Sequence, residues 1–259
     1  MQATVSEQVN LDQLCRTPYV QILTYPRISL RAAKGRVRQL RQLGVESLTF
    51  EGRAKIGRLG LLGIGTVGVV VKCVSGRKEY ALKIRRTDAN RPSLAEEYKL
   101  TSFANRLGVG APLQGHTKDF LMMKYLDYVE FADWVKHLHG EGTARRARDM
   151  VHEILNQCRK LDIMGLDHGQ LSNLRKHVVI AEDRPWIIDF ESASMSRRPS
   201  NVTSAAQYLL VGGRISPLVR RLLGLRDTAP VLVLLREYKH GLDDFNYSRL
   251  LELLKLGAS

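Results

Sequence analysis

The sequence has few cysteines and no long apolar run, and each absence excludes a class of protein. Its 259 residues include three cysteines that are far apart and form no CxxC pair: Cys15, Cys73 and Cys158. This pattern predicts a cytoplasmic protein with reduced thiols and no zinc site. No apolar run reaches the roughly 18 residues that a membrane-spanning helix needs. The first residues, MQATVSEQVNLDQ, have neither the basic start nor the apolar stretch of a secretory signal.

The sequence is also short of acidic residues. Forty Lys and Arg against 26 Asp and Glu give a formal net charge of +14. Such an excess favours an acidic partner such as RNA, DNA or a nucleotide, and a basic surface without any such partner is the alternative. The hydrophobic share of 44% and the charged share of 25% are ordinary for a globular protein. The chain is long enough for one large domain or two small lobes.

A basic amphipathic helix is predicted at about 26–43. Its apolar positions recur at intervals of three and four residues, at Ile28, Ala32, Ala33, Val37, Leu40 and Leu43. Another face carries a row of cations that we name the basic ridge: Arg27, Arg31, Lys34, Arg38 and Arg41. The basic ridge would bind RNA or a ribonucleoprotein, or it would be the solvated face of a helix that packs on a sheet.

The remaining pattern predicts an α+β fold. Strands are expected at 45–50, 67–74, 79–84 and 120–125, with a helix from 93 to about 107 among them. After residue 130 the pattern is mostly helical, apart from two short strands at 178–180 and 186–190. The last helices would begin at Ser216 and Thr228, and would end at Gly224, Gly241 and Gly257. This order predicts a small antiparallel sheet with one helix, followed by a mostly helical part.

A glycine-rich segment, Gly63-Ile64-Gly65-Thr66-Val67-Gly68, is followed by valines typical of a strand. The dinucleotide-binding fingerprint needs a helix at that point, so we expect a turn between two strands instead. Glycines let backbone N–H groups approach phosphate oxygens with no Cβ in the way. The segment therefore predicts a phosphate-binding lid, with a plain glycine-rich hairpin as the alternative.

Lys83 lies within the apolar stretch YALKI, on a predicted central strand. A buried ammonium group is costly unless it has a partner. The next helix offers two carboxylates, Glu96 and Glu97, and Glu96 can be used by a capping box that begins at Ser93. We therefore predict an ion pair between Lys83 and Glu97.

Two later stretches carry residues typical of phosphoryl transfer. In WIIDFE an apolar strand ends in Asp189, whose carboxylate would bind a hard cation together with phosphate oxygens. The stretch LDHGQLSN contains His168, Gln170 and Asn173. A His-Gly pair and an Asn, followed by a strand that ends in Asp, are the polar parts of many phosphotransferase sites.

From about Gly57 onward these motifs, in this order, resemble the protein-kinase superfamily. The chain is similar to the small atypical archaeal branch, related to the RIO kinases and the small kinase of the KEOPS complex. The stretches ILTYPR, ALKIRRTDANR and IIDFESAS resemble a group of predicted archaeal serine/threonine kinases. The resemblance implies a bilobal protein-kinase-like fold with an N-terminal extension at 1–56, an N-lobe at 57–124 and a C-lobe at 125–259.

The resemblance also implies the ligands and the residues that bind them. ATP would be held by Gly63, Gly65, Gly68, Val70 and Lys83, and its adenine would meet Met123, Tyr125 and Leu126. Glu97 would orient Lys83, and Asp189 would hold Mg²⁺ or Mn²⁺. Asn173 is the candidate second metal ligand.

The catalytic loop departs from the kinase pattern. Where H-R-D and H-G-D loops place Asp, this chain has Gln170, which can orient a hydroxyl but cannot take its proton. Asp167 or His177 would replace the missing base, or transfer would proceed without one, because it depends mainly on positioning and charge. His168 would organise the loop.

The segment after Asp189 has no A-P-E motif, so we expect no conventional platform for a peptide substrate. Its Arg197 and Arg198 would bind phosphate or remain solvated. The sequence therefore predicts an atypical serine/threonine protein kinase of weak activity. The alternative is an ATP-binding pseudokinase or slow ATPase that acts with RNA or a ribonucleoprotein.

Overall fold

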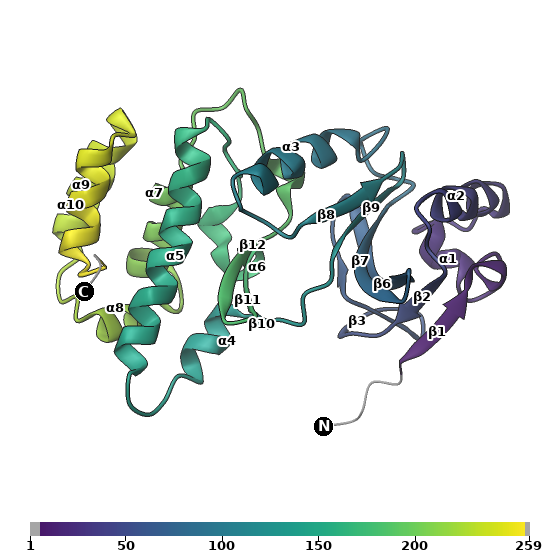
Figure 1. Cartoon of the computed structure of the whole chain (residues 1–259), viewed down its shortest axis with the longest axis horizontal. Helices are drawn as coiled ribbons and strands as arrows, with labels where there is room; N and C mark the ends of the chain where they lie inside the picture. The colour runs from purple at the N-terminus through teal and green to yellow at the C-terminus, as the bar shows by residue number, and fades with distance from the viewer. Residues whose placement is uncertain (1–5, 257–259) are drawn as a thin grey trace. The chain divides into compact units, whose positions relative to one another are not determined.

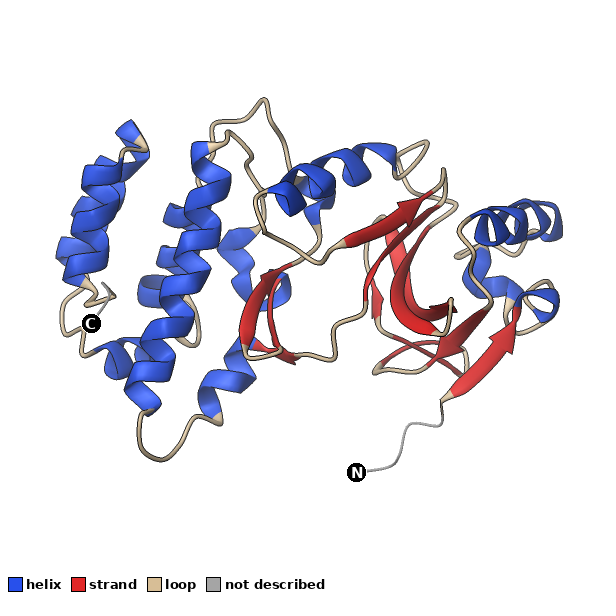
Figure 2. Cartoon of the chain, in the orientation of Figure 1, coloured by secondary structure: helices blue, strands red, loops and turns tan. Residues whose placement is uncertain are grey.

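The computed structural model describes residues 6–256. The chain divides into two compact units: the residues up to Ser102 together with Ala111–Leu126, and Phe103–Gly110 together with the residues from Asp127 onward. The first unit is built mainly from strands and the second mainly from helices (Figure 2). The predicted α+β class, with an antiparallel sheet followed by a helical part, is confirmed.

One antiparallel sheet forms the first unit (Figure 1). Its strands lie in the order β1-β2-β6-β7-β9-β8, and β5 pairs with β6. Their bounds are β1 Glu7–Asn10, β2 Ser47–Phe50, β5 Gly63–Ile64, β6 Gly68–Ser75, β7 Lys78–Arg85, β8 Leu113–His116 and β9 Phe120–Lys124. A separate strand pair consists of β3 Ala54–Ile56 and β4 Leu59–Leu61, and helix α3 spans Ala95–Arg106. Every strand predicted in this part of the chain is present.

The segment before the glycine-rich turn joins this sheet, because β1 pairs with β2 and β2 pairs with β6. It also contains η1 Leu11–Gln13, α1 Val20–Leu23 and α2 Leu30–Gln42. Helix α2 begins later than predicted, because Ser29 caps it by accepting a hydrogen bond from the Ala32 amide at 3.3 Å. Ile28 therefore precedes the helix and is 61% exposed, so its assignment to the apolar face was wrong.

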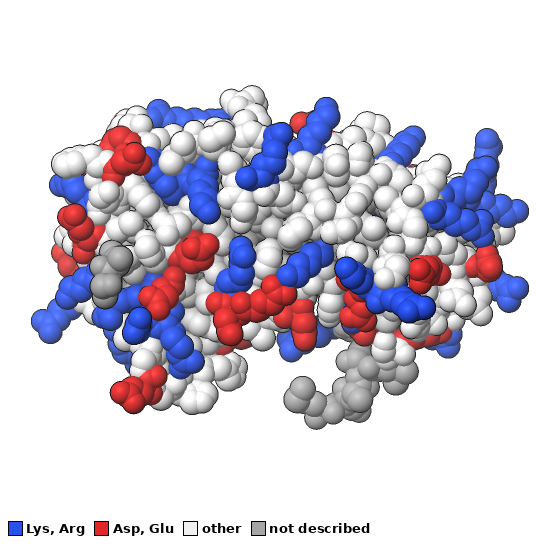
Figure 3. All heavy atoms as spheres, in the orientation of Figure 1, with Lys and Arg blue, Asp and Glu red and all other residues white. Residues whose placement is uncertain are grey.

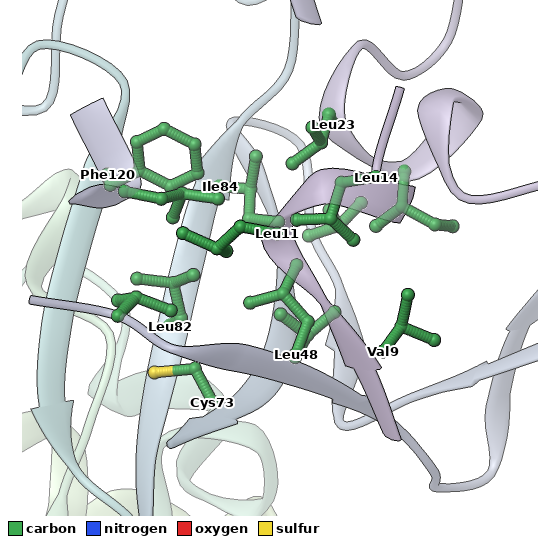
Figure 4. Close-up of a cluster of buried hydrophobic side chains, with 14 of the residues drawn as sticks. Val9, Leu11, Leu14, Leu23, Leu48, Cys73, Leu82, Ile84 and Phe120 are labelled. Carbon is green, nitrogen blue, oxygen red and sulfur yellow. The ribbon is translucent and has the colours of Figure 1, made fainter. Parts of the chain in front are cut away.

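The main core of the first unit lies between the sheet and the N-terminal helices. Ala33, Val37 and Leu40 of α2 are buried there, as predicted. Figure 4 shows side chains of this cluster from β1, β2, β6, β7 and β9, and from η1 and α1, labelled Val9, Leu11, Leu14, Leu23, Leu48, Cys73, Leu82, Ile84 and Phe120. The helices before β2 are therefore part of the fold of the sheet.

A buried polar cluster also fixes α2 to the sheet. Arg36 is only 3% exposed, donates to the Leu23 carbonyl and lies 3.0 Å from the Asp119 carboxylate. Gln39 and Arg85 donate to the same carboxylate at 2.9 and 2.8 Å. Burial alone would raise the pKa of Asp119, but these hydrogen bonds and the two arginine charges outweigh it and lower that pKa.

The second unit combines a small sheet with a set of helices. Its strands lie in the order β10-β11-β12, with bounds Val129–Glu130, Val178–Ala181 and Arg184–Ile187. The longest helix is α5, Thr143–Ile163, and its buried face includes Ile154 and Leu155. The shorter helical elements are α4 Phe131–Lys136, η2 Leu171–Asn173, α6 Leu174–His177, η3 Phe190–Ser192, α7 Asn201–Gln207, η4 Tyr208–Gly212, α8 Ser216–Leu223, α9 Ala229–Gly241 and α10 Asp244–Leu253.

The ends predicted for the last helices agree with the structure. Helix α8 begins at Ser216 and is closed by Gly224, which has a left-handed backbone, while α9 begins directly after Thr228 and ends at Gly241. The predicted stop at Gly257 lies outside the described residues. Within residues 6–256, no helix is both long enough and apolar enough to cross a membrane.

Candidate functional site

The glycine-rich segment forms a tight turn between β5 and β6, as predicted. The Gly65 amide closes this turn by donating to the Gly68 carbonyl at 2.8 Å. A Cβ on Gly68 would lie 2.9 Å from Cγ of Lys83 and 3.0 Å from the Ile84 carbonyl, so only glycine lets β7 approach here. A Cβ on Gly63 would meet no atom of the described residues within 4 Å. Gly68 is thus packed tightly against Lys83, whereas Gly63 borders open space.

Lys83 and Glu97 form the ion pair that the sequence predicts. Nζ of Lys83 lies 2.7 Å from Oε1 of Glu97, and the two residues are 5% and 3% exposed. Glu96 instead points to solvent and lies 3.6 Å from Lys99. The assignment of the inward carboxylate to Glu97 is therefore confirmed. The sheet and α3 hold a cation in a fixed place, with little water around it.

The residues proposed for adenine lie on the same sheet and just after it. Val70 is opposite Lys83 in the register of β6 and β7, and Met123 is near the end of β9. Val70 and Met123 are half-buried. Strand β9 ends at Lys124, so Tyr125 and Leu126 follow it. The contact of these residues with adenine stays a prediction.

In the second unit, Asp189 follows a strand that is shorter than predicted. Strand β12 ends at Ile187, so the expectation of a strand through Phe190 was wrong. The reason is the backbone of Asp189, which has a left-handed conformation with φ 68° and ψ 72° and cannot continue a ladder. A non-glycine residue in this region costs about 1–2 kcal/mol. Strain of this kind is concentrated at functional sites.

His168 supports the peptide that precedes Asp189. It is completely buried, and its Nε2 is 3.0 Å from the Ile188 carbonyl oxygen. The ring of Phe190 contacts it edge-on at 4.9 Å between centroids, and the ring of His177 lies 5.3 Å away. This position supports the interpretation of His168 as the histidine that organises the loop. His177 is itself buried, at 6% exposure.

The burial of His168 predicts a pH dependence of stability. Burial, followed by the neighbouring His177, lowers the pKa of His168 to about 4, whereas the unfolded chain titrates near 6.5. Between these two pKa values the unfolded state binds more protons than the folded state. The free energy of unfolding therefore has its full value above about pH 6.5 and falls as the pH is lowered toward 4. Urea unfolding at pH 7, 5.5 and 4.5 should show a fall in stability to which His168 contributes up to about 1.4 kcal/mol per pH unit. His168→Asn should lower the slope without abolishing it, because burial also lowers the pKa of His177, and equal slopes in both proteins would contradict this origin.

The carboxylate of Asp167 is not open to solvent. Asp167 is 7% exposed, and its Oδ2 accepts a hydrogen bond from Nε of Arg197 at 2.9 Å. Gln170 is half-buried, and its side-chain oxygen accepts no hydrogen bond from the described residues. Asn173 is exposed in the turn η2. The three polar residues of this loop therefore differ: Asp167 is paired, Gln170 has a buried oxygen that accepts no hydrogen bond from the described residues, and Asn173 is on the surface.

A buried hydrogen-bond network anchors the same loop, and sequence analysis did not predict it. Oδ1 of Asp162 accepts from the amide and the side chain of Asn201, at 2.8 and 2.7 Å. The side-chain oxygen of Asn201 in turn accepts from the His168 amide at 2.9 Å, and its Nδ2 donates to the Leu166 carbonyl at 2.7 Å. An Asp inside a helix pattern and an Asn at a helix start look like ordinary surface residues in the sequence. Their shared burial at 2% and 1% exposure reveals the network.

The donor set for a metal ion is small. Among residues 6–256 no three His, Cys, Asp or Glu side chains gather closely enough to hold an ion. Mg²⁺, however, usually binds through one or two carboxylates together with substrate phosphates. The carboxylate of Asp189, presented at the end of a strand, fits that mode of binding.

The basic ridge is exposed along its whole length. Lys and Arg side chains gather over α2 in Figure 3, and the exposed members are Arg27, Arg31, Lys34, Arg38 and Arg41. Arg41 also lies 2.7 Å from the exposed carboxylate of Asp12. The basic ridge faces away from the core. This exposure agrees both with binding of RNA and with a solvated helix face, so it does not distinguish the two interpretations.

The fold places this chain among proteins with a protein-kinase-like architecture. The structure of APH(2")-IIa in a ternary complex with streptomycin and ATP, an aminoglycoside phosphotransferase, has a similar fold with a TM-score of 0.51. The match covers 77% of this chain and 84% of that chain at 13% sequence identity. At this identity the similarity establishes the fold alone. No family model matches the sequence.

One curated protein is similar to this chain in sequence. The uncharacterized protein MJ1211 of Methanocaldococcus jannaschii is 31% identical over 103 residues, which are 40% of this chain and 84% of that protein. The chain belongs to the family of MJ1211. Its closer relation to the RIO and KEOPS kinases stays a prediction.

Proposed function

We propose that this chain is an ATP-dependent phosphotransferase with a serine or threonine hydroxyl as acceptor. The observation that carries the proposal is the buried ion pair of Lys83 and Glu97 beside Gly68. In protein kinases, a strand lysine paired with a helix glutamate binds the phosphates of ATP. The presence of ATP in the complex of APH(2")-IIa, which shares the fold, supports ATP as the donor.

The first unit would bind the nucleotide. Lys83 and the backbone of the glycine-rich turn, with Gly63, Gly65 and Gly68, would hold the phosphates. Adenine would be bound by the half-buried or buried apolar side chains near the end of β9 and across the sheet: Val70, Met123, Tyr125 and Leu126. Glu97 would keep the ammonium group of Lys83 in one place during the reaction.

The second unit would supply the metal ligand and the groups on the acceptor side. Asp189 would hold Mg²⁺ or Mn²⁺, with Asn173 as a further ligand, and the ion would neutralise charge on the transferring phosphoryl group. The side chain of Gln170, which stands where kinase loops place Asp, would orient the acceptor hydroxyl. Asp167 would receive the proton. Asp167 would only replace the aspartate that kinase loops have at the position of Gln170. Because a well-placed general base contributes about 10²–10⁴-fold, activity would be slow but measurable.

Phosphate transfer from γ-labelled ATP, with Mg²⁺ or Mn²⁺, tests the proposal. Asp189→Asn should abolish transfer that the wild-type protein shows. Asp183→Asn is a matched control, because Asp183 is also an aspartate with positive φ, exposed in the turn between β11 and β12. Transfer that Asp189→Asn leaves unchanged would refute a role for Asp189 and, with it, the proposed function.

An ATP-binding pseudokinase or slow ATPase that acts with RNA is the second candidate. The observations that favour it are Gln170 in the catalytic loop and the exposed basic ridge. Binding of a structured RNA should weaken steeply with salt and should be lost in Arg31→Gln/Lys34→Gln/Arg38→Gln, because the contacts would be to phosphates. Binding that survives these substitutions would exclude the ridge as the RNA site.

A further inference from the structure

Arg197 makes the closest polar contact to the Asp167 carboxylate. Its Nε donates to Oδ2 of Asp167 at 2.9 Å, whereas the Ser200 amide donates to Oδ1 at a longer 3.4 Å. The guanidinium group thus occupies Oδ2 of Asp167, so an acceptor hydroxyl cannot reach this oxygen while the contact is closed.

The guanidinium also ties two chain segments together. Nη2 of Arg197 donates to the Ser192 carbonyl at 2.5 Å, while the backbones of Asp167 and Ser194 exchange hydrogen bonds at 2.9 and 2.8 Å. The hydroxyl oxygen of Ser194 accepts from the amides of Ser196 and Arg197, at 3.1 and 3.3 Å, and so fixes the turn that presents the arginine. The segment after Asp189 therefore delivers Arg197 to the catalytic loop.

Gly169 provides the room for this contact. Its backbone has φ +81°, and a Cβ there would collide with Nη2 of Arg197 and lie 2.8 Å from the Ser192 carbonyl. The glycine of the His-Gly pair is thus needed for the arginine to pass over the loop. Arg197 is nevertheless 51% exposed, so water reaches one side of the ion pair and the contact can open.

We propose that Arg197 is an autoinhibitory latch, which occupies the Asp167 carboxylate and keeps it from serving as the general base until the contact opens. The inference rests on the proposed phosphotransferase function. When the latch is open, the acceptor O–H bond breaks and its proton goes to the Asp167 carboxylate. The acceptor oxygen then bonds to the γ-phosphorus, and the bond from that phosphorus to ADP breaks with its electron pair on ADP. The latch thus explains why Asp167, a carboxylate next to His168 of the catalytic loop, is paired with Arg197.

The experiment compares phosphate transfer from labelled ATP in wild type, Arg197→Gln and Arg197→Gln/Asp167→Asn. Opening the latch should raise the rate at least tenfold, because a working general base contributes about 10²–10⁴-fold. The second substitution should remove the gain. Arg145→Gln is the matched control and should leave the rate unchanged, since the Arg145 side chain is 86% exposed on α5 and lies 4.0 Å from the exposed carboxylate of Asp149.

Thermal unfolding of each variant checks that it folds, and Arg197→Met, which keeps the aliphatic part of the side chain, replaces Arg197→Gln if that protein is unstable. A rate in folded Arg197 variants that is equal to or below that of wild type would overturn the latch. So would a gain that persists after Asp167→Asn. If neither wild type nor the Arg197 variants show transfer that Asp189→Asn abolishes, the proposed function itself fails. A failed latch in an active, Asp189-dependent enzyme leaves the proposed function standing.

Discussion

Lys83→Met is expected to lower phosphate transfer by about 10²–10³-fold, the usual loss when one positioned electrostatic group is removed. The same substitution should destabilise the fold by about 3–5 kcal/mol, because it leaves the carboxylate of Glu97 buried without its cation. Both effects follow from the 2.7 Å contact and from the burial of the two residues.

The double substitution Lys83→Met/Glu97→Leu separates the two effects. A buried ion pair replaced by apolar side chains of similar volume is often as stable as the original, so the free energy of unfolding should return close to the wild-type value. Transfer should remain lost. Urea unfolding and a transfer assay on the same preparations measure both quantities.

A matched control for this pair lies on the same strand. Lys78 is exposed at the start of β7, and Lys78→Met should change neither stability nor transfer appreciably. Recovery of transfer in the double variant would mean that the pair has only a structural role. A double variant as unstable as Lys83→Met would show that the buried carboxylate is not the source of the destabilisation.

Asp162→Ala is expected to destabilise the protein by about 3–5 kcal/mol, since several buried donors lose their acceptor at once. Besides the two bonds from Asn201, its carboxylate accepts from the Val202 amide at 3.0 Å and the Tyr238 hydroxyl at 2.9 Å. Burial raises the pKa of Asp162, although these hydrogen bonds work in the opposite direction. The carboxylate is thus held by neutral donors without a directly bonded cation among them.

The effect should extend to the catalytic loop. Asn201, released from Asp162, no longer fixes the His168 amide, so hydrogen exchange at that amide should accelerate in Asp162→Ala. Asp133→Ala is the control, because the Asp133 side chain is 45% exposed and pairs at 3.0 Å with the exposed Lys136, and it should change stability by about 0.5 kcal/mol or less. A loss of stability in Asp162→Ala as small as in the control would contradict the role of the network.

The sequence predicted the features that depend on neighbouring residues or on burial of a charge. The pairing of Lys83 with Glu97 followed from the cost of an unpaired ammonium group on a central strand, and the turn at Gly63–Gly68 followed from the valines after it. Both are present in the structure. The antiparallel sheet and the helical part followed from hydrophobic periodicity.

Features that depend on distant contacts could not be predicted in this way. Arg36 lies in a helix full of surface cations, and the sequence offers no sign that it reaches Asp119 in the turn between β8 and β9. Strand β1 was missed because EQVN is short and polar and gains its partner only from β2. The left-handed backbone of Asp189, which shortens β12, is likewise set by the surroundings, including the bond of His168 to the preceding carbonyl.

The position of β2 beside β6 has a consequence for synthesis on the ribosome. The helices before β2 emerge early, but their apolar faces have nothing to cover until β6, β7 and β9 have also been made, as far as Lys124. Contacts over such sequence separations slow folding and leave hydrophobic surface open meanwhile. The nascent chain therefore exposes this apolar surface until synthesis has passed Lys124.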